Sequence, residues 1–166
     1  MQTAERNRAD GEAERDSVAF VRFRLGGFPL ALEAGHVARV SPVPERTRLP
    51  GAPAPVVGLG YVAGRPTTLV SLADRLDVDP EGEDREVVVI RGDEGPPVGL
   101  LVDGTSGLLT APVDAVTPPA ESGDFFLGDA TDDPLFRAVV TFDDGPAYVL
   151  SPGSVHALTS NGGYRP

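Results

Sequence analysis

The stretch Ser17-Val-Ala-Phe-Val-Arg-Phe-Arg-Leu25, followed by Gly26-Gly27 and Phe28-Pro-Leu-Ala-Leu32, decides the fold class. Apolar and polar side chains alternate along its first part, so that Phe23 and Leu25 share one face and Arg22 and Arg24 the other, a period of two that is typical of a β-strand. The two glycines can supply the positive φ angles of a tight turn, and the alternation then resumes. The sequence predicts that a β-hairpin opens the fold.

Similar signals recur along the rest of the chain. Gly and Pro number 20 and 17 among 166 residues, which is usual where short strands are joined by tight turns. Further strands are predicted at 46–49 (a short edge strand), 56–61, 66–72, 86–90, 98–102, 107–116 (an extended segment), 137–142 and 147–150. One helical turn is predicted within 33–39, a short helix over 72–76, and a terminal helix from the N-cap Ser151 to about Leu158. About ten strands at 8- to 12-residue spacing predict an all-β barrel or sandwich architecture, with five strands on each side of the acidic loop 77–84.

The ends of the chain carry different signals. Residues 1–16 hold eight charges and no large apolar residue after Met1, which predicts a disordered tail, and residues 159–166 are predicted to be a mobile tail. Residues 121–134 carry five acids and no base, which is typical of a solvated loop. No apolar run reaches the 18 residues that a bilayer span needs, and the N-terminus lacks a signal-peptide core, so a cytoplasmic location is expected.

Charge and cysteine content exclude several function classes. The net charge is −11, from 25 acids against 14 basic residues, so phosphate backbones are repelled and nucleic acid is not an expected partner. All 14 basic residues are Arg. An acidic, lysine-free surface favours a halophilic protein in a high-salt cytoplasm, and the alternative is codon bias in a GC-rich genome. The absence of cysteine excludes disulfides and thiolate chemistry.

No motif supports catalysis, a cofactor or a metal. Gly58-Leu-Gly-Tyr-Val-Ala-Gly64 imitates a dinucleotide loop, but a strand-like run follows it where a helix N-terminus is required. The run from Asp77 imitates a calcium loop, yet its twelfth position is Val88 instead of a bidentate acid. The two histidines, His36 and His156, lie in no metal-ligand spacing and are expected at the surface or in a cap. The sequence therefore predicts a non-enzymatic β module that acts through its surface, with a small-molecule-binding β-barrel as the alternative class.

The order of several weak motifs resembles the CheW family of chemotaxis coupling proteins over residues 18–158. The motifs are Phe23-Arg-Leu-Gly-Gly-Phe-Pro-Leu-Ala-Leu32, Val37-Ala-Arg-Val40, Leu49-Pro-Gly-Ala-Pro53, Val57-Gly58, Leu69-Val-Ser-Leu72, Val98-Gly-Leu-Leu-Val-Asp103, Pro118-Pro119 and Val149-Leu-Ser-Pro152. The resemblance implies one domain over 17–158 made of two five-stranded SH3-like β-barrels, with short helices at their junction and at the C-terminus. The first subdomain is expected over about 28–84, and the second over about 85–150 together with strand 17–27.

The resemblance also implies a function and its surfaces. A CheW-like protein is a non-catalytic scaffold that couples the cytoplasmic tips of methyl-accepting chemoreceptors to the regulatory domain of the CheA histidine kinase. By position in the family motifs, the kinase-side residues are Val37, Arg39, Val40, Leu49 and Pro50. The receptor-side residues are those of an altered hairpin, Tyr61, Ala63, Gly64 and Arg65.

This sequence departs from the family pattern at that hairpin. The family's Asn-Leu-Arg-Gly stands here as Tyr61-Val-Ala-Gly64, so that Ala63 replaces an arginine whose guanidinium offers five donors. Ser71 stands where the family has an aspartate, and Arg39 stands where many relatives carry an acid. The joint changes at 63 and 71 suggest that a polar network linking the two positions has been removed. A specialised paralogue that has lost receptor coupling and binds another signalling partner is therefore the alternative within the same fold.

Overall fold

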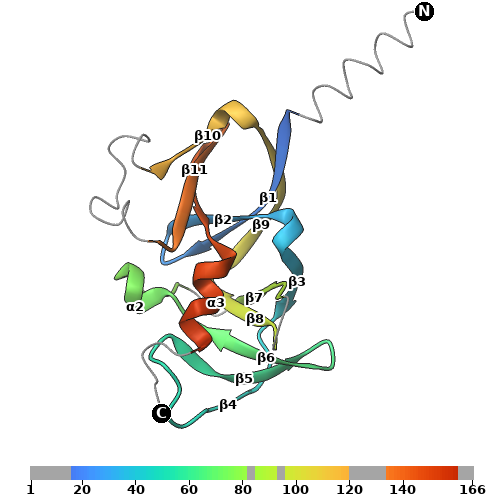
Figure 1. The fold of residues 1–166 in the computed structure, drawn as a ribbon, viewed down its shortest axis with the longest axis vertical. Coiled ribbons are helices and arrows are strands. Elements are labelled where there is room, and N and C mark those ends of the chain that lie inside the picture. Colours follow the sequence, from blue (N-terminus) through green and yellow to red (C-terminus); the bar gives the residue numbers. More distant parts are fainter. Residues whose placement is uncertain (1–15, 82–84, 93–95, 120–133, 161–166) are drawn as a thin grey trace, which may run out of the picture.

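Twelve β-strands in two sheets make up most of the computed structural model, which describes residues 16–81, 85–92, 96–119 and 134–160 (Figure 1). The strands are β1 Ser17–Leu25, β2 Phe28–Glu33, β3 Val37–Pro42, β4 Arg46–Thr47, β5 Val56–Val62, β6 Arg65–Val70, β7 Glu86–Ile90, β8 Val98–Val102, β9 Gly104–Pro112, β10 Val116–Thr117, β11 Phe136–Phe142 and β12 Gly145–Leu150. The helices are the 3-10 turns η1 Ala34–His36 and η2 Val113–Ala115 and the α-helices α2 Ala73–Leu76 and α3 Pro152–Ser160.

The two sheets repeat one strand order. The upper sheet runs β10-β11-β12-β2-β1-β9 and the lower sheet runs β4-β5-β6-β8-β7-β3, with the single parallel pairings β12–β2 and β6–β8 at the centre of each. In Figure 1 they lie one above the other, with α3 against the junction. The lower sheet uses six consecutive strands, whereas the upper sheet is completed by the N-terminal hairpin β1–β2. The predicted all-β class with two SH3-like barrels is confirmed, with short helices after β6 and β12.

The opening hairpin forms as its sequence predicts. Leu25 pairs with Phe28 across a two-residue turn in which Gly26 and Gly27 have φ angles of 58° and 77°. The strand β1 is buried on both faces, however, because Phe23 enters the core between the sheets while Phe20 enters the interior of the upper barrel. This is ordinary alternation along β1, and the bulge in the pairing with β9 lies on β9, where Ser106 is the extra residue between Thr105 and Gly107.

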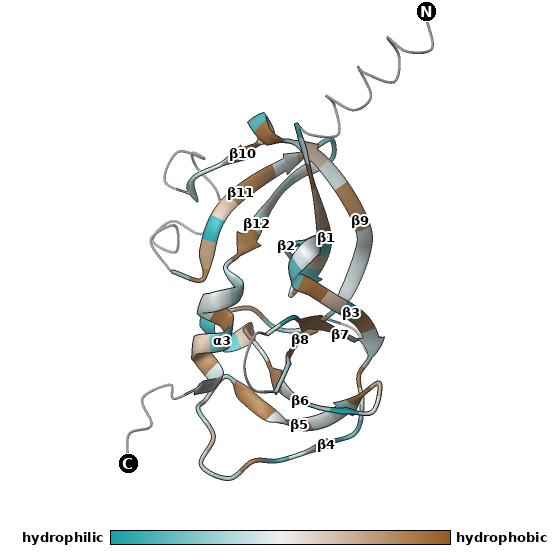
Figure 2. Ribbon diagram, turned by 45° about the vertical axis from the view of Figure 1, so that its right-hand side comes forward, coloured by the Kyte–Doolittle hydropathy of each residue, from teal (hydrophilic) through white to brown (hydrophobic). Residues whose placement is uncertain are grey.

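Three apolar clusters hold the molecule together. The largest lies between the sheets and takes residues from both of them and from α3, including Leu30, Val88, Ile90, Leu100 and Val155. A second cluster fills the upper barrel, and a third, Val62, Leu69, Val87, Val89 and Leu101, fills the lower one. Strands β7 and β8 alternate between the first and third clusters, so the prediction that 86–90 is buried on both faces is confirmed. Figure 2 shows these strands as a hydrophobic band where the sheets meet.

The strands divide between the sheets differently from the expected split at residues 84 and 85. Strands β7 and β8 belong to the lower sheet, since β8 pairs with β6 and β7 pairs with β3, whereas β2 belongs to the upper sheet beside β12. The acidic loop after α2 returns the chain to the sheet that it left, so it does not separate two barrels. Each sheet also has six strands instead of five, because β3 in the lower sheet and β10 in the upper sheet add to the ten predicted strands.

Two smaller expectations also meet the structure. Residues 37–42 form an antiparallel strand against β7, although Ser41-Pro-Val-Pro44 reads as a Pro-rich connection. Pro42 is tolerated because β3 is an edge strand and needs no hydrogen bond on its outer side. The tail and loop predicted for residues 1–15, 121–133 and 161–166 lie outside the described residues.

Candidate functional site

The hairpin β5–β6 ends in a two-residue turn with positive φ at both positions. Val62 pairs with Arg65, and Ala63 and Gly64 between them have φ angles of 51° and 79°. A left-handed alanine costs about 1 kcal/mol, so the turn carries a small strain that its glycine does not share. Tyr61 precedes the turn with 68% of its surface exposed. The structure thus brings the four predicted receptor-side residues together on one exposed hairpin.

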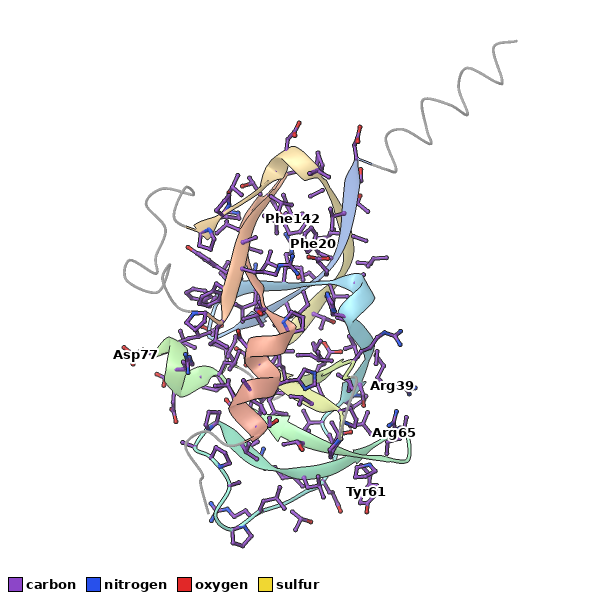
Figure 3. The ribbon with its side chains drawn as sticks, in the orientation of Figure 1. Phe20, Arg39, Tyr61, Arg65, Asp77 and Phe142 are labelled. Atoms are coloured by element: carbon purple, nitrogen blue, oxygen red, sulfur yellow. The ribbon has the colours of Figure 1, made fainter. Side chains whose placement is uncertain are left out.

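A groove of about 570 Å³ runs beside this hairpin and gathers three arginines. We call it the arginine groove; its described lining is Ala38, Arg39, Val62, Ala63, Arg65, Thr67, Val89, Ile90, Arg91, Gly92 and Pro97. The lining comes from β3, from the hairpin and from the ends of β7 and β8, which meet at one end of the lower sheet. Figure 3 shows Arg39 and Arg65 on the same side of the molecule, with Tyr61 nearby. Arg39, predicted on the kinase side, therefore lies next to the predicted receptor-side residues.

A β-bulge sets the direction of Arg39. Val37 pairs with Ile90 and Arg39 pairs with the adjacent Val89, so Ala38 is an extra residue on β3. Without the extra residue Val37 and Arg39 would share a face, because side chains alternate along a strand. With it, Val37 packs against the core between the sheets while Arg39 projects from the opposite face. Sequence periodicity alone does not reveal such a bulge.

The backbones of Arg91 and Arg65 are held by specific hydrogen bonds. The Arg91 N–H donates to the His36 carbonyl at 2.8 Å, and the Arg91 carbonyl accepts from Nε2 of His156 at 3.0 Å, so the imidazole carries a proton on Nε2. The hydroxyl of Thr67, which is almost fully buried, donates to the Arg65 carbonyl at 3.1 Å. The two histidines thus help to order one wall of the groove, a role that their sequence spacing did not indicate.

The remaining predicted kinase-side residues lie elsewhere on the lower sheet. Leu49 and Pro50 line a second groove of about 570 Å³ together with Arg46, Arg48, Val56 and Val57. Leu49 and Val40 are 39% and 38% exposed, which is high for large apolar side chains. The five predicted residues therefore do not form one cluster, since Val37 turns inward and Arg39 lines the arginine groove.

The inferred network between positions 63 and 71 is contradicted by the structure. Ala63 lies at the tip of the hairpin and Ser71 just beyond the other end of β6, so about 20 Å of strand separates them. An arginine side chain cannot bridge that distance. The Ser71 hydroxyl instead accepts a hydrogen bond from the Ala73 N–H at 3.3 Å, at the start of α2. Ser71 is thus a helix-start residue, and Ala63 must be considered by itself.

Two arginines of the upper sheet, Arg22 and Arg137, form ion pairs within that sheet. Arg22 donates to Asp144 at 2.5 Å and Arg137 lies 3.0 Å from Glu33. The hydrogen bond from Arg22, more than any other influence, holds the pKa of the Asp144 carboxyl below its usual 3.8. The guanidinium of Arg22 also lies 5.4 Å from the centre of the Phe142 ring. These arginines stabilise the protein's own surface.

The structure also bears on the dinucleotide-loop imitation and on membrane-spanning segments. The run Gly58–Gly64 forms most of β5 and the turn after it, and β6 follows in place of a helix, so the imitation of a dinucleotide loop has no structural counterpart. No helix in the described part of the chain is both long and apolar enough to cross a membrane.

The comparison with protein families decides the identity of the fold. The model of the CheW-like domain matches residues 19–158, from β1 to α3. The chain belongs to the CheW-like family. This CheW-like protein is 27% identical over 111 residues to the probable chemotaxis protein CheW of Rhizobium etli, a match that covers 66% of this chain and 70% of that protein. Family membership supports a role as a chemotaxis adaptor.

A solved structure has the same fold. The crystal structure of the scaffolding protein TtCheW from Thermoanaerobacter tengcongensis matches with a TM-score of 0.71 and 19% identity, over 89% of this chain and 97% of that chain. The predicted resemblance to CheW proteins is confirmed by these matches.

Proposed function

We propose that this CheW-like protein is a non-catalytic chemotaxis adaptor of the cytoplasm that couples chemoreceptor tips to the regulatory domain of a CheA-type histidine kinase. The observation that carries the proposal is the family match over residues 19–158, which spans both sheets and the C-terminal helix. The name of the solved neighbour, a scaffolding protein, agrees with it. An adaptor of this kind needs two separate binding surfaces and no chemistry of its own.

The filled barrel interiors favour surface binding over small-molecule binding. Side chains of Phe20, Val140 and Val149 occupy the upper barrel and those of Leu69 and Leu101 the lower one, each at most 2% exposed. A ligand inside either barrel would have to displace this packed core. Two members of the lower core, Val62 and Val89, also line the arginine groove.

The lower sheet offers two candidate surfaces. We assign the receptor side to Tyr61, Ala63, Gly64 and Arg65 on the β5–β6 hairpin. We assign the kinase side to the exposed apolar residues Val40 and Leu49 with Pro50, and to Val37, which begins β3 and packs against the core between the sheets. Aromatic residues and arginine are enriched at the centres of protein interfaces, which favours Tyr61 and Arg65 as binding residues on the receptor side.

A second candidate within the family is favoured by Ala63. The family's arginine at this position is absent, and a specialised paralogue would bind the kinase but not the receptor. The two candidates differ in one measurable property, which is affinity for the receptor tip.

Calorimetric titration tests the proposal. The full-length protein is titrated with the CheA regulatory domain and with a receptor-tip fragment from the same cell, in KCl at which circular dichroism shows the fold. Binding to both supports the adaptor, kinase binding alone supports the paralogue, and binding to neither contradicts both. Leu49→Asp should weaken kinase binding at least tenfold, whereas Leu108→Asp, a matched change at a residue 66% exposed on the upper sheet, should leave it unchanged.

A further inference from the structure

The charge of this protein is distributed unevenly along the chain. Residues 34–73, which include β3 to β6, hold four arginines and a single acid, Glu45, and so carry a net charge of +3. The other 126 residues hold 10 arginines and 24 acids, a net charge of −14. A basic region on so acidic a protein attracts acidic partners and orients them towards one face.

The three groove arginines are not neutralised by described residues. Ion pairs between described residues use Arg22, Arg85 and Arg137, none of which lines the arginine groove. Among the described lining residues of the groove there is no Asp or Glu. The positive charges of Arg39, Arg65 and Arg91 repel one another when they lie close together. Carboxylates of a bound partner would offset this repulsion and be attracted to the groove. Each guanidinium presents a planar fork that matches a carboxylate.

The groove is also ordered in advance. The bulge at Ala38 directs Arg39, and the hydrogen bonds from His156 and to His36 fix the backbone of Arg91. Ordering in the free protein reduces the entropy that binding would otherwise cost. Tyr61, strongly exposed on the strand that leads into the hairpin, adds an aromatic contact of the kind enriched in protein interfaces.

We propose that the arginine groove binds an acidic polypeptide segment of the receptor-side partner, through carboxylates that pair with Arg39, Arg65 and Arg91. The inference rests on the proposed adaptor function, and it names the chemistry by which the receptor side recognises its partner. A polypeptide fits better than a nucleic acid, because the surrounding charge of −14 repels a long polyanion, whereas a short acidic segment contacts only the groove. The three groove arginines take the place of an arginine at position 63 as the source of receptor affinity.

Charge reversal in the full-length protein tests the proposal. The variant Arg39→Glu/Arg91→Glu is compared with Arg24→Glu/Arg137→Glu, which makes the same charge change on the upper sheet, after circular dichroism confirms that both fold. The probes are the receptor-tip fragment and the kinase regulatory domain, at the lowest KCl that maintains the fold. The groove variant should bind the receptor tip at least tenfold more weakly and the kinase domain within threefold of the unchanged protein. The control variant should bind both within threefold.

Other patterns of loss would overturn the inference, and a separate probe distinguishes its failure from that of the adaptor function. Equal loss in both variants would mean that total charge matters and the groove does not, and loss of kinase binding alone would move the groove to the kinase side. If the unchanged protein binds neither domain, the adaptor function fails, and a 12-residue glutamate-rich peptide then tests the groove by itself. Binding of that peptide, but not of its glutamine counterpart, should disappear in the groove variant only. No binding of the peptide would overturn the groove proposal independently of the adaptor function.

Discussion

The hairpins β5–β6 and β11–β12 occupy equivalent places in the two sheets but treat charge in opposite ways. Both join the second and third strands of the repeated order through two-residue turns, closed by the pairs Val62–Arg65 and Phe142–Gly145. The upper turn carries Asp144, which binds Arg22 of the same sheet. The lower turn carries no acid, and the side chain of Arg65 beside it forms no ion pair with a described residue. The charge on the upper hairpin is therefore neutralised within the protein, whereas Arg65 on the lower hairpin is not neutralised by a described residue.

The largest expected effect comes from Phe142, a packed residue that flanks the turn of the upper hairpin. Phe142, 9% exposed, packs edge to face on Phe20 with ring centres 5.9 Å apart. Phe142→Ala should lower the free energy of unfolding by about 4 kcal/mol, because it leaves a cavity in the upper barrel. Tyr61→Ala on the lower hairpin should change it by less than about 0.5 kcal/mol, since that side chain is mostly in water. Urea denaturation measures both values, and similar losses would remove the contrast between the hairpins.

The next effect concerns two turn glycines, Gly26 and Gly64, that both have positive φ angles but differ in the space around them. A Cβ at Gly26 would lie 2.6 Å from Cβ of Val78 and 2.7 Å from the Asp79 carbonyl oxygen, whereas a Cβ at Gly64 would meet no atom within 4 Å. Gly26→Ala should cost about 3 kcal/mol, from left-handed strain and overpacking together. Gly64→Ala should cost about 1 kcal/mol, from strain alone. Equal losses in thermal or urea unfolding would mean that the Val78 loop moves aside freely.

A smaller effect tests the strain in the lower turn. Ala63→Gly should raise the free energy of unfolding by about 0.5 kcal/mol, because relief of the left-handed alanine exceeds the entropy lost with glycine. Ala54→Gly, at an exposed position without a positive φ, is the control and should lower stability slightly. A loss of stability in Ala63→Gly would contradict the left-handed turn.

Resemblance and periodicity predicted much of the fold but not its long-range contacts. The hairpins at 17–32 and 56–72 follow from local alternation and turn residues, and local signals of this kind can be read from a sequence. That β8 pairs with β6 and β2 with β12 depends on contacts between distant residues, so the division of the strands was wrong.

Only the part of the candidate site that is continuous in sequence was predicted, because contacts between distant residues leave no local signal. Residues 61–65 are neighbours in sequence and stay neighbours in space. The approach of Arg39 and Arg91 depends on a bulge at Ala38 and on the pairing of β3 with β7, neither of which leaves a local signal. The predicted network between positions 63 and 71 was wrong because the order of motifs in a sequence does not give the distance between residues in the fold.

The smallest expected effect concerns the ion pair between Arg22 and Asp144 on the upper hairpin. Because Arg22 lowers the folded pKa of Asp144, the pair stabilises the protein above pH 3.8, and this contribution is lost as the pH falls through the lowered pKa. Arg22→Gln should bring the pKa of Asp144 back towards 3.8, and Arg24→Gln should raise it less. NMR titration of the Asp144 carboxyl carbon measures both, and an unchanged pKa in Arg22→Gln would contradict the ion pair.

An adaptor of this kind holds both partners on one molecule at once, and sedimentation of a three-component mixture shows whether this protein does so. The full-length protein is mixed with equimolar CheA regulatory domain and receptor-tip fragment, in KCl that maintains the fold, and the mass of the largest complex is measured. We expect a complex that contains all three, because the groove lined by Leu49 and Pro50 shares no described lining residue with the arginine groove. Displacement of one partner by the other, or complexes of only two components, would contradict it.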